Sequence, residues 1–117
     1  MKTSSAKAKG RRLQQQVRDA FLSKTWYVPH PVKLREGDVK SAIMGESGRD
    51  IHLSPAAEDV IPFDIECKNT ETASPWAWMK QAKENTKPGR MPLVAFTRNR
   101  EGDVYAMIRF EDLLKLL

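Results

Sequence analysis

Cysteine and histidine are scarce in this chain, which has one cysteine and two histidines among 117 residues. Cys67 cannot form an internal disulfide, and the alternating pattern around it turns it toward the core. We therefore expect a small buried hydrophobic residue in a protein of a reducing compartment. Neither His30 nor His52 is close to Cys67 in sequence, which argues against a catalytic thiol.

Long apolar runs are also missing. No stretch approaches the roughly twenty residues that span a membrane, so we expect no transmembrane segment. The basic N-terminus continues into Gly10-Arg11-Arg12 rather than into an apolar segment, so we expect no signal peptide. With 40% hydrophobic and 30% charged residues, the composition is that of one ordinary globular domain, and we expect a cytoplasmic protein.

Positive charge is in excess, with a formal net charge of +5. The basic residues group near the N-terminus and after position 80, which suits a partner made of phosphates. Each of them taken alone is better explained as part of a solvated helix face. Together they can line a path for a nucleic-acid backbone without reading its sequence. The candidates for this path are Lys7, Lys9, Arg11, Arg12, Lys80 and Lys83.

The chain divides into a flexible basic arm, expected over residues 1–9, and one domain over residues 10–117. Apolar residues at helical spacing follow the arm, and Ser54-Pro55 and Ser74-Pro75 both look like helix starts. Trp26 to Pro31 predicts an irregular connection, because two prolines block regular pairing. We expect helices over 11–23, 76–85 and 111–117, and strands over 39–44, 50–53, 63–68, 93–97 and 104–110. This order predicts an α/β fold with a central mixed sheet flanked by helices.

The strand over 63–68 carries an unusual run of charges. Apolar and charged residues alternate strictly in Phe63-Asp64-Ile65-Glu66-Cys67-Lys68, so the three charged side chains share one face. Such residues are disfavoured in strands. Asp50 begins a shorter alternating run upstream. If the two runs pair as antiparallel neighbours with Asp50 opposite Glu66, both carboxylates project from one face and form a site for a hard divalent cation, with Lys68 beside it.

A solvated ion pair is the competing interpretation, because an acidic residue, any residue and then lysine arises readily by chance. The same spacing recurs as Asp38-Val39-Lys40. Context favours a function for Glu66-Cys67-Lys68: this motif ends an apolar strand, follows Asp50, and precedes a polar loop and a helix. The pattern is that of a metal-dependent nuclease.

The sequence over a wider range resembles the PD-(D/E)XK nuclease superfamily, and within it small phage-type enzymes related to Holliday-junction resolvases. The similarity runs from Gly10 to the C-terminal leucines. It rests on Gly48-Arg49-Asp50-Ile51, Leu53-Ser54-Pro55-Ala56-Ala57, Ile65-Glu66-Cys67-Lys68-Asn69, Trp76 and Gln81-Ala82. The resemblance implies a restriction-endonuclease-like αβββαββ core, DNA as the substrate, and a phage or bacterial host cell.

The resemblance also assigns roles. Mg²⁺, which Mn²⁺ can replace, would be held by Asp50, Glu66 and the main-chain carbonyl of Cys67, and Lys68 would act on the attacking water. Gln81 would assist from the next helix. Related resolvases carry a first-helix glutamate, but this chain has Gln14-Gln15-Gln16 there, so the number of metal ions stays open.

The sequence leaves three functions open. A resolvase-like enzyme would cut branched DNA as a homodimer, because paired cuts need two symmetric sites. Trp76, Trp78 and the leucines of residues 113–117 are the apolar residues available for self-association. A nicking or flap nuclease is the alternative within the enzyme class. A non-catalytic DNA-binding protein is the third, disfavoured by the complete set of Asp50, Glu66 and Lys68.

Overall fold

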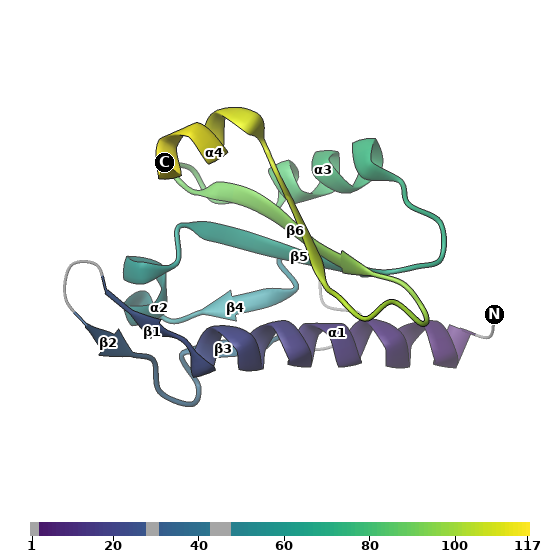
Figure 1. The fold of residues 1–117 in the computed structure, drawn as a ribbon, viewed down its shortest axis with the longest axis horizontal. Coiled ribbons are helices and arrows are strands. Elements are labelled where there is room, and N and C mark those ends of the chain that lie inside the picture. Colours follow the sequence, from purple (N-terminus) through teal and green to yellow (C-terminus); the bar gives the residue numbers. More distant parts are fainter. Residues whose placement is uncertain (1–2, 28–30, 43–47) are drawn as a thin grey trace.

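Helix α1 (Thr3–Ser23) is the longest element of the computed structural model, which describes residues 3–27, 31–42 and 48–117. Its apolar residues recur every three or four positions, so one stripe of the helix can be buried. Leu13 and Val17 lie on this stripe and pack against Ile65 and Cys67 of the sheet. Figure 1 shows α1 running along one side of the molecule beneath the strands.

The flexible arm expected over residues 1–9 is corrected by this helix, which begins at Thr3. The side chain of Lys9 is 4% exposed, and its Nζ lies 3.4 Å from Oε1 of Glu71. A contact with a residue 62 positions away holds this part of the chain in place. Local sequence gives no sign of such a tertiary contact.

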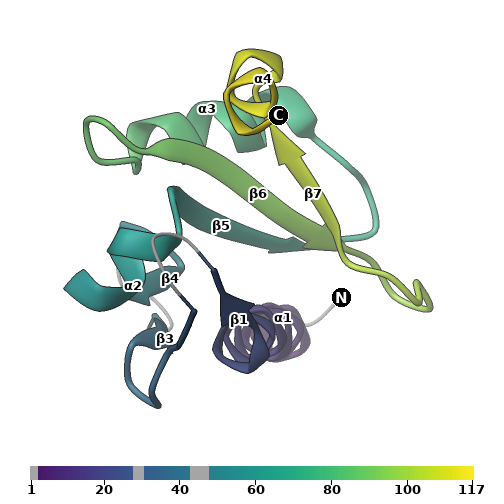
Figure 2. The ribbon, with the colours of Figure 1, turned by 60° about the vertical axis from the view of Figure 1, so that its left-hand side comes forward.

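The three-stranded sheet consists of β5 (Phe63–Asn69), β6 (Met91–Thr97) and β7 (Tyr105–Ile108). β5 and β6 are parallel and joined through helix α3 (Pro75–Glu84), whereas β6 and β7 form an antiparallel pair. Parallel neighbours need such a crossover connection. In Figures 1 and 2, α1 covers one face of this sheet, while α3 and the C-terminal helix α4 (Phe110–Leu116) lie over the other.

The remaining strands form two small hairpins. β1 pairs with β2, and β3 pairs with β4, both antiparallel. Helix α2 begins as expected, with Pro55 in its first turn and the hydroxyl of Ser54 accepting a hydrogen bond from the Ala57 amide at 3.1 Å. The bounds of these elements are β1 (Thr25–Trp26), β2 (Val32–Lys33), β3 (Val39–Ser41), β4 (Ile51–Leu53), α2 (Pro55–Val60) and α4 (Phe110–Leu116).

Two expectations for the sheet differ from the structure. β4 pairs with β3 and not with β5, so the predicted antiparallel pairing of Asp50 opposite Glu66 is wrong. The described strands accordingly form separate small sheets and not one central sheet. The irregular connection expected over Trp26 to Pro31 is corrected at its start, because Trp26 pairs with Val32 in a short antiparallel ladder; residues 28–30 lie outside the described part. The general class, an α/β fold with a mixed sheet and helices, is confirmed.

The core is divided by the three-stranded sheet. One cluster joins the sheet to α1, β3, β4 and α2 through Leu13, Val39, Ile51 and Ile65. A smaller cluster lies under α3, where Trp78 and Ala82 contact Val94. The charged face of β5 therefore points toward α3, and the apolar face toward α1. Of the helices in the described ranges, none is both long and apolar enough to cross a bilayer.

Candidate active site

Asp50 reaches β5 through its side chain. Gly48, whose φ is +97°, turns the chain into β4, and Asp50 stands directly before that strand. Its Oδ2 accepts a hydrogen bond from the main-chain amide of Cys67 at 2.7 Å. The carboxylate thus replaces a strand-to-strand hydrogen bond at the free edge of β5. This contact brings Asp50 next to Glu66, although the strand pairing expected to do so does not form.

Glu66 is a buried carboxylate with one unsatisfied oxygen. Glu66 is 2% exposed, and its Oε1 accepts a hydrogen bond from Nδ2 of Asn85 at 2.8 Å. Its Oε2 is buried and accepts no hydrogen bond from a donor among the described residues, and only a protonated Glu66 can share a hydrogen bond with the Asp50 carboxylate. A buried acceptor without a partner is uncommon, because it loses its hydration without compensation. This oxygen marks the place where a cation or water would be expected to bind.

The pKa of Glu66 is raised from its usual 4.5 to about 7. Burial is the largest cause, because it disfavours the charged carboxylate, and the neighbouring Asp50 adds to the effect. The Asn85 hydrogen bond and the positive charge of Lys68 act in the opposite direction. When both are ionised, the carboxylates of Asp50 and Glu66 repel each other, and a proton or a cation between them removes this repulsion.

Lys68 and Gln81 are also brought together. Lys68 follows Glu66 on the same face of β5, and its Nζ donates a hydrogen bond to Oε1 of Gln81 on α3 at 2.6 Å. Asn85, the C-cap residue of α3, lies one turn further along and contacts Glu66. The two amides thus contact the two β5 residues in reverse chain order, Gln81 with Lys68 and Asn85 with Glu66. This pairing orients both site residues from one helix.

Asn85 is the site residue that sequence analysis missed. Its Nδ2 contacts both Glu66 and, at 3.3 Å, the main-chain carbonyl of Gly48. It therefore links the segment before Asp50 to β5. The signal in the sequence was its spacing of four residues from Gln81, which puts two amides on one helical face directly after the charged strand.

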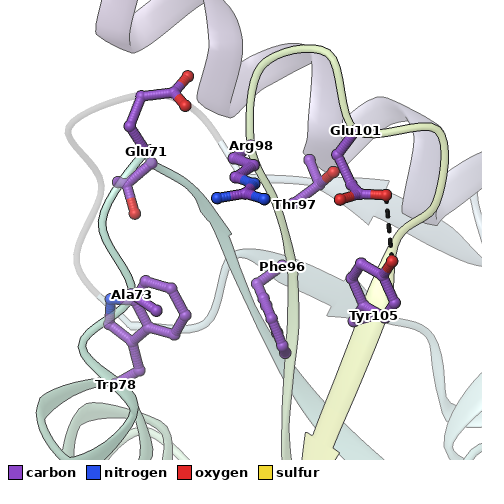
Figure 3. A pocket seen from close by; sticks show the side chains of 9 residues that line it. Glu71, Ala73, Trp78, Phe96, Thr97, Arg98, Glu101 and Tyr105 are labelled. Atoms are coloured by element: carbon purple, nitrogen blue, oxygen red, sulfur yellow. Dashed lines mark hydrogen bonds between the residues drawn. The ribbon is translucent and has the colours of Figure 1, made fainter.

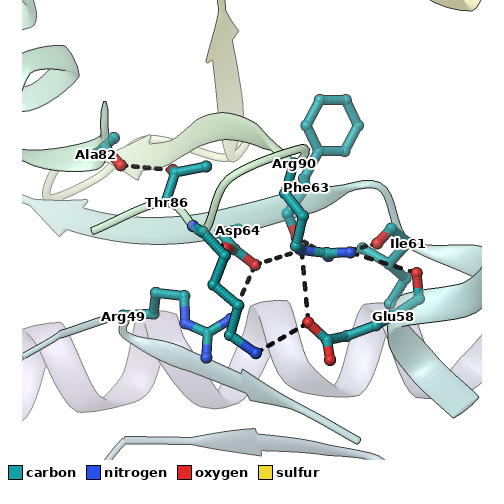
Figure 4. Close-up of polar contacts among 9 residues, drawn as sticks. Arg49, Glu58, Ile61, Phe63, Asp64, Ala82, Thr86 and Arg90 are labelled. Atoms are coloured by element: carbon teal, nitrogen blue, oxygen red, sulfur yellow. Dashed lines mark hydrogen bonds and ion pairs between the residues drawn. The ribbon is translucent and has the colours of Figure 1, made fainter. Parts of the chain in front are cut away.

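Asp64 lies on the same face of β5 but has a structural role. Its carboxylate accepts hydrogen bonds from Arg49 at 3.0 Å, from Arg90 at 2.8 Å and from the Lys87 amide at 2.9 Å (Figure 4). Burial by itself would raise the pKa of Asp64, but these three hydrogen bonds outweigh it and lower the pKa. Asp64 is therefore held in ion pairs with Arg49 and Arg90.

The second copy of the acidic-x-lysine spacing is also structural. Asp38 accepts hydrogen bonds from the Ser54 hydroxyl and from the Arg35 amide, both at 2.7 Å. These two contacts lower its pKa, the Ser54 bond being the larger cause. Lys40 is exposed. The two copies therefore differ in their surroundings, because Asp38 has its hydrogen bonds satisfied while Glu66 does not.

Burial distinguishes the remaining residues that the sequence singled out, which are Cys67, Trp76, Trp78 and Gln14. The thiol of Cys67 is buried, and burial followed by the charges of Asp50 and Glu66 raises its pKa, so it stays protonated at neutral pH and is no nucleophile. Trp78 is buried under α3, whereas Trp76 is 91% exposed. Gln14 is buried, with an Oε1 that has no partner among the described residues.

The donor set fits a hard divalent cation. Two adjacent carboxylates, one of them with an unpartnered buried oxygen, supply the oxygen ligands that Mg²⁺ prefers. The carbonyl of Cys67 remains the third ligand expected from the resemblance. The described residues contain no group of three or more His, Cys, Asp or Glu side chains arranged for a metal. The proposed ligand set differs from such a group, because it has two side-chain carboxylates, Asp50 and Glu66, and the main-chain carbonyl of Cys67.

The basic residues proposed to contact DNA divide into two groups. Lys9 is buried against Glu71, so its place on a DNA-binding surface is corrected. The others lie on exposed faces of α1 and α3 and stay candidates: Lys7, Arg11, Arg12, Lys80 and Lys83.

Comparisons with models of known protein families, with curated proteins and with solved structures gave no match.

Proposed function

We propose that this protein is a Mg²⁺-dependent endodeoxyribonuclease of the PD-(D/E)XK type. The observation that carries the proposal is the buried Oε2 of Glu66, which has no hydrogen-bond donor among the described residues and lies in a carboxylate beside Asp50 and Lys68. A retired or purely structural carboxylate would be expected to have its hydrogen bonds satisfied, as Asp64 and Asp38 do.

Each residue has a role in phosphodiester hydrolysis. Asp50, Glu66 and the Cys67 carbonyl would hold the ion, which when bound would neutralise charge on the attacked phosphate and favour deprotonation of water. The Lys68 ammonium would orient the attacking water and offset charge that develops on the phosphate oxygens. Gln81 would fix the position of the Lys68 Nζ through their 2.6 Å hydrogen bond. Asn85 would do the same for Glu66.

Branched DNA is the substrate class that we infer from the resemblance and the surface. Resolution of a junction needs two sites related by symmetry, and this chain exposes a set of apolar residues that a second copy would cover. Trp76 is 91% and Leu117 90% exposed, and the other members are Phe110, Leu113, Leu114 and Leu116. A nicking or flap nuclease needs only one site and is the second candidate if the protein is monomeric.

The decisive experiment compares labelled four-way junction, flap and linear duplex of identical sequence, incubated with Mg²⁺. Wild-type protein should cut at least one of the branched forms. Asp50→Asn and Lys68→Ala should abolish cleavage, while DNA affinity stays similar, or rises for Asp50→Asn because a negative charge is removed. Replacing Mg²⁺ by Ca²⁺ should also abolish it.

Matched controls are available on the same chain. Asp59 and Lys33 are exposed residues away from the site, so Asp59→Asn and Lys33→Ala should cut at the wild-type rate. Undiminished cleavage by Asp50→Asn would refute the assignment. Binding without cleavage by the wild-type protein, with every metal tested, would favour the non-catalytic DNA-binding alternative.

A further inference from the structure

A hollow of about 270 Å³ lies at the carboxyl ends of β5 and β6, where the turn between β6 and β7 closes over it (Figure 3). Three aromatic rings form its walls, from Trp78 on α3, Phe96 on β6 and Tyr105 on β7. Ligand pockets in proteins start at about 300 Å³. The size therefore suits one small ring system and no larger ligand.

The rings leave part of their faces available. The centroids of Trp78 and Phe96 are 5.5 Å apart with an angle of 47° between the planes, and those of Phe96 and Tyr105 are 5.7 Å apart at 34°. Neither pair is flatly stacked. Tyr105 is 45% exposed, and its hydroxyl donates a hydrogen bond to Glu101 at 3.0 Å, which holds the ring in place. The hollow thus has an aromatic wall in which the Tyr105 ring is both held in place and accessible, while Trp78, at 8% exposure, forms its base.

Polar groups line the rim of the hollow. The carboxylate of Glu71 accepts a hydrogen bond from the Asn99 amide at 3.0 Å, which helps fix its position, and that of Glu101 is held by Tyr105. The exposed guanidinium of Arg98 lies near them, as Figure 3 shows. Carboxylate oxygens accept hydrogen bonds from the amino groups of bases, and arginine binds phosphate or stacks on a ring.

The hollow lies beside the candidate active site. In the strand register Lys68 pairs with Phe96, and Phe96 pairs with Tyr105, so the three side chains form one row across the same face of the sheet. Neighbouring strands are about 4.8 Å apart. On α3, Trp78 lies one turn before Gln81, the partner of Lys68. The aromatic wall therefore begins directly beside the lysine.

We propose that this hollow binds a single unpaired base of the DNA substrate, from a nucleotide next to the phosphate at Lys68. The proposal rests on the nuclease function proposed above and deepens it. A base in continuous duplex is stacked on both faces and paired at its edge, so it cannot enter an aromatic pocket without being extruded. The substrate class would then be DNA with an unpaired nucleotide at the cleavage point, such as a flap or an opened branch.

Binding can be tested in EDTA, where no cleavage occurs. The fluorescent base 2-aminopurine is placed in the unpaired position of a flap, or paired within a duplex of the same sequence. Wild-type protein should bind the flap more tightly and quench its fluorescence, because the base stacks on the rings. Stacking on an aromatic residue contributes enough that Tyr105→Ala should weaken flap binding about 5- to 150-fold. Duplex binding should change less than about twofold.

Two variants act as controls. Tyr105→Phe keeps the ring and should retain the quenching. Tyr27→Ala removes a tyrosine that is 68% exposed on another part of the molecule, and should bind both DNAs as the wild type does. If Tyr105→Ala does not fold, wild-type protein is tested against a flap with an abasic nucleotide at the same position, which should bind with a similar loss. Equal binding of flap and duplex by the wild type, with unchanged fluorescence, would overturn the proposal.

Cleavage with Mg²⁺ separates this proposal from the one on which it rests. A protein that cuts a flap equally well with an abasic nucleotide on either side of the cut is a nuclease without a base pocket, and the present inference fails. A protein that quenches the unpaired base but cuts no DNA has the pocket, and the nuclease function fails.

Discussion

Replacing Glu66 by glutamine should stabilise the metal-free protein above neutral pH. The wild-type carboxylate is buried beside Asp50, and its folded-state pKa of about 7 is above its usual 4.5. A raised pKa in the folded state contributes stability that is fully present below pH 4.5 and is lost as the pH rises through 7. The amide that Glu66→Gln introduces carries no charge and can donate a hydrogen bond to Asp50.

The size of the effect follows from the shift. The difference between a pKa of 4.5 in the unfolded chain and about 7 in the folded protein sets an upper bound of about 3 kcal/mol on the gain in unfolding free energy at pH 8. Part of this is recovered by small movements around the buried carboxylate, so we expect a gain of about 1 to 3 kcal/mol. At pH 5 the Glu66 carboxyl group is protonated in the folded wild type and partly ionised in the unfolded chain, so the gain from Glu66→Gln should be less than about 1 kcal/mol.

Urea unfolding in EDTA at pH 5 and pH 8 measures both values. Glu84→Gln, which neutralises an exposed carboxylate on α3, is the matched control and should show no such pH dependence. Added Mg²⁺ at ten times its dissociation constant should stabilise the wild type by about 1.4 kcal/mol. It should leave Glu66→Gln nearly unchanged. An equal effect of Glu66→Gln at both pH values would refute the reasoning about the buried charge.

Asp64→Ala should destabilise the fold by about 3 kcal/mol in urea unfolding, because Arg49 and Arg90 lose their shared carboxylate; a loss below about 1 kcal/mol would contradict this role. Lys80→Ala and Lys83→Ala should each reduce the slope of log affinity against log salt by about 1 in DNA-binding titrations, and an unchanged slope would place them off the DNA path. Leu114→Lys combined with Leu117→Lys should convert a wild-type dimer into monomers in sedimentation velocity, because charges replace exposed apolar groups on α4. A monomeric wild type would move the proposed function to a nicking or flap nuclease.

Local signals in the sequence predicted most elements around the site. Alternation identified β5, the Ser54-Pro55 start identified α2, and Ser74-Pro75 placed the start of α3, although the Ser74 side chain makes no capping hydrogen bond. Each of these signals depends on residues within a few positions of one another, which explains why they can be read from one sequence.

Contacts between distant residues could not be predicted in the same way. The side chain of Asp50 reaches the Cys67 amide 17 positions away, and Lys9 reaches Glu71 62 positions away. No local pattern distinguishes a carboxylate that replaces a strand hydrogen bond from one that faces water. The expected proximity of Asp50 and Glu66 was therefore right, while the strand pairing proposed to cause it was wrong.

The attachment of Asp50 to β5 by a side chain has a consequence for how activity would fail. Asp50 directly precedes β4 of one sheet and Glu66 lies in β5 of another, and the Asp50–Cys67, Asn85–Gly48 and Arg49–Asp64 hydrogen bonds link the two segments near the site. A small outward displacement of the β3–β4 hairpin would separate the carboxylates while every helix and strand stayed intact. The proposed cleavage activity should then be lost at a lower urea concentration than the helical circular dichroism signal. Activity would therefore report the position of the hairpin against β5 before any spectroscopic signal of the fold changes.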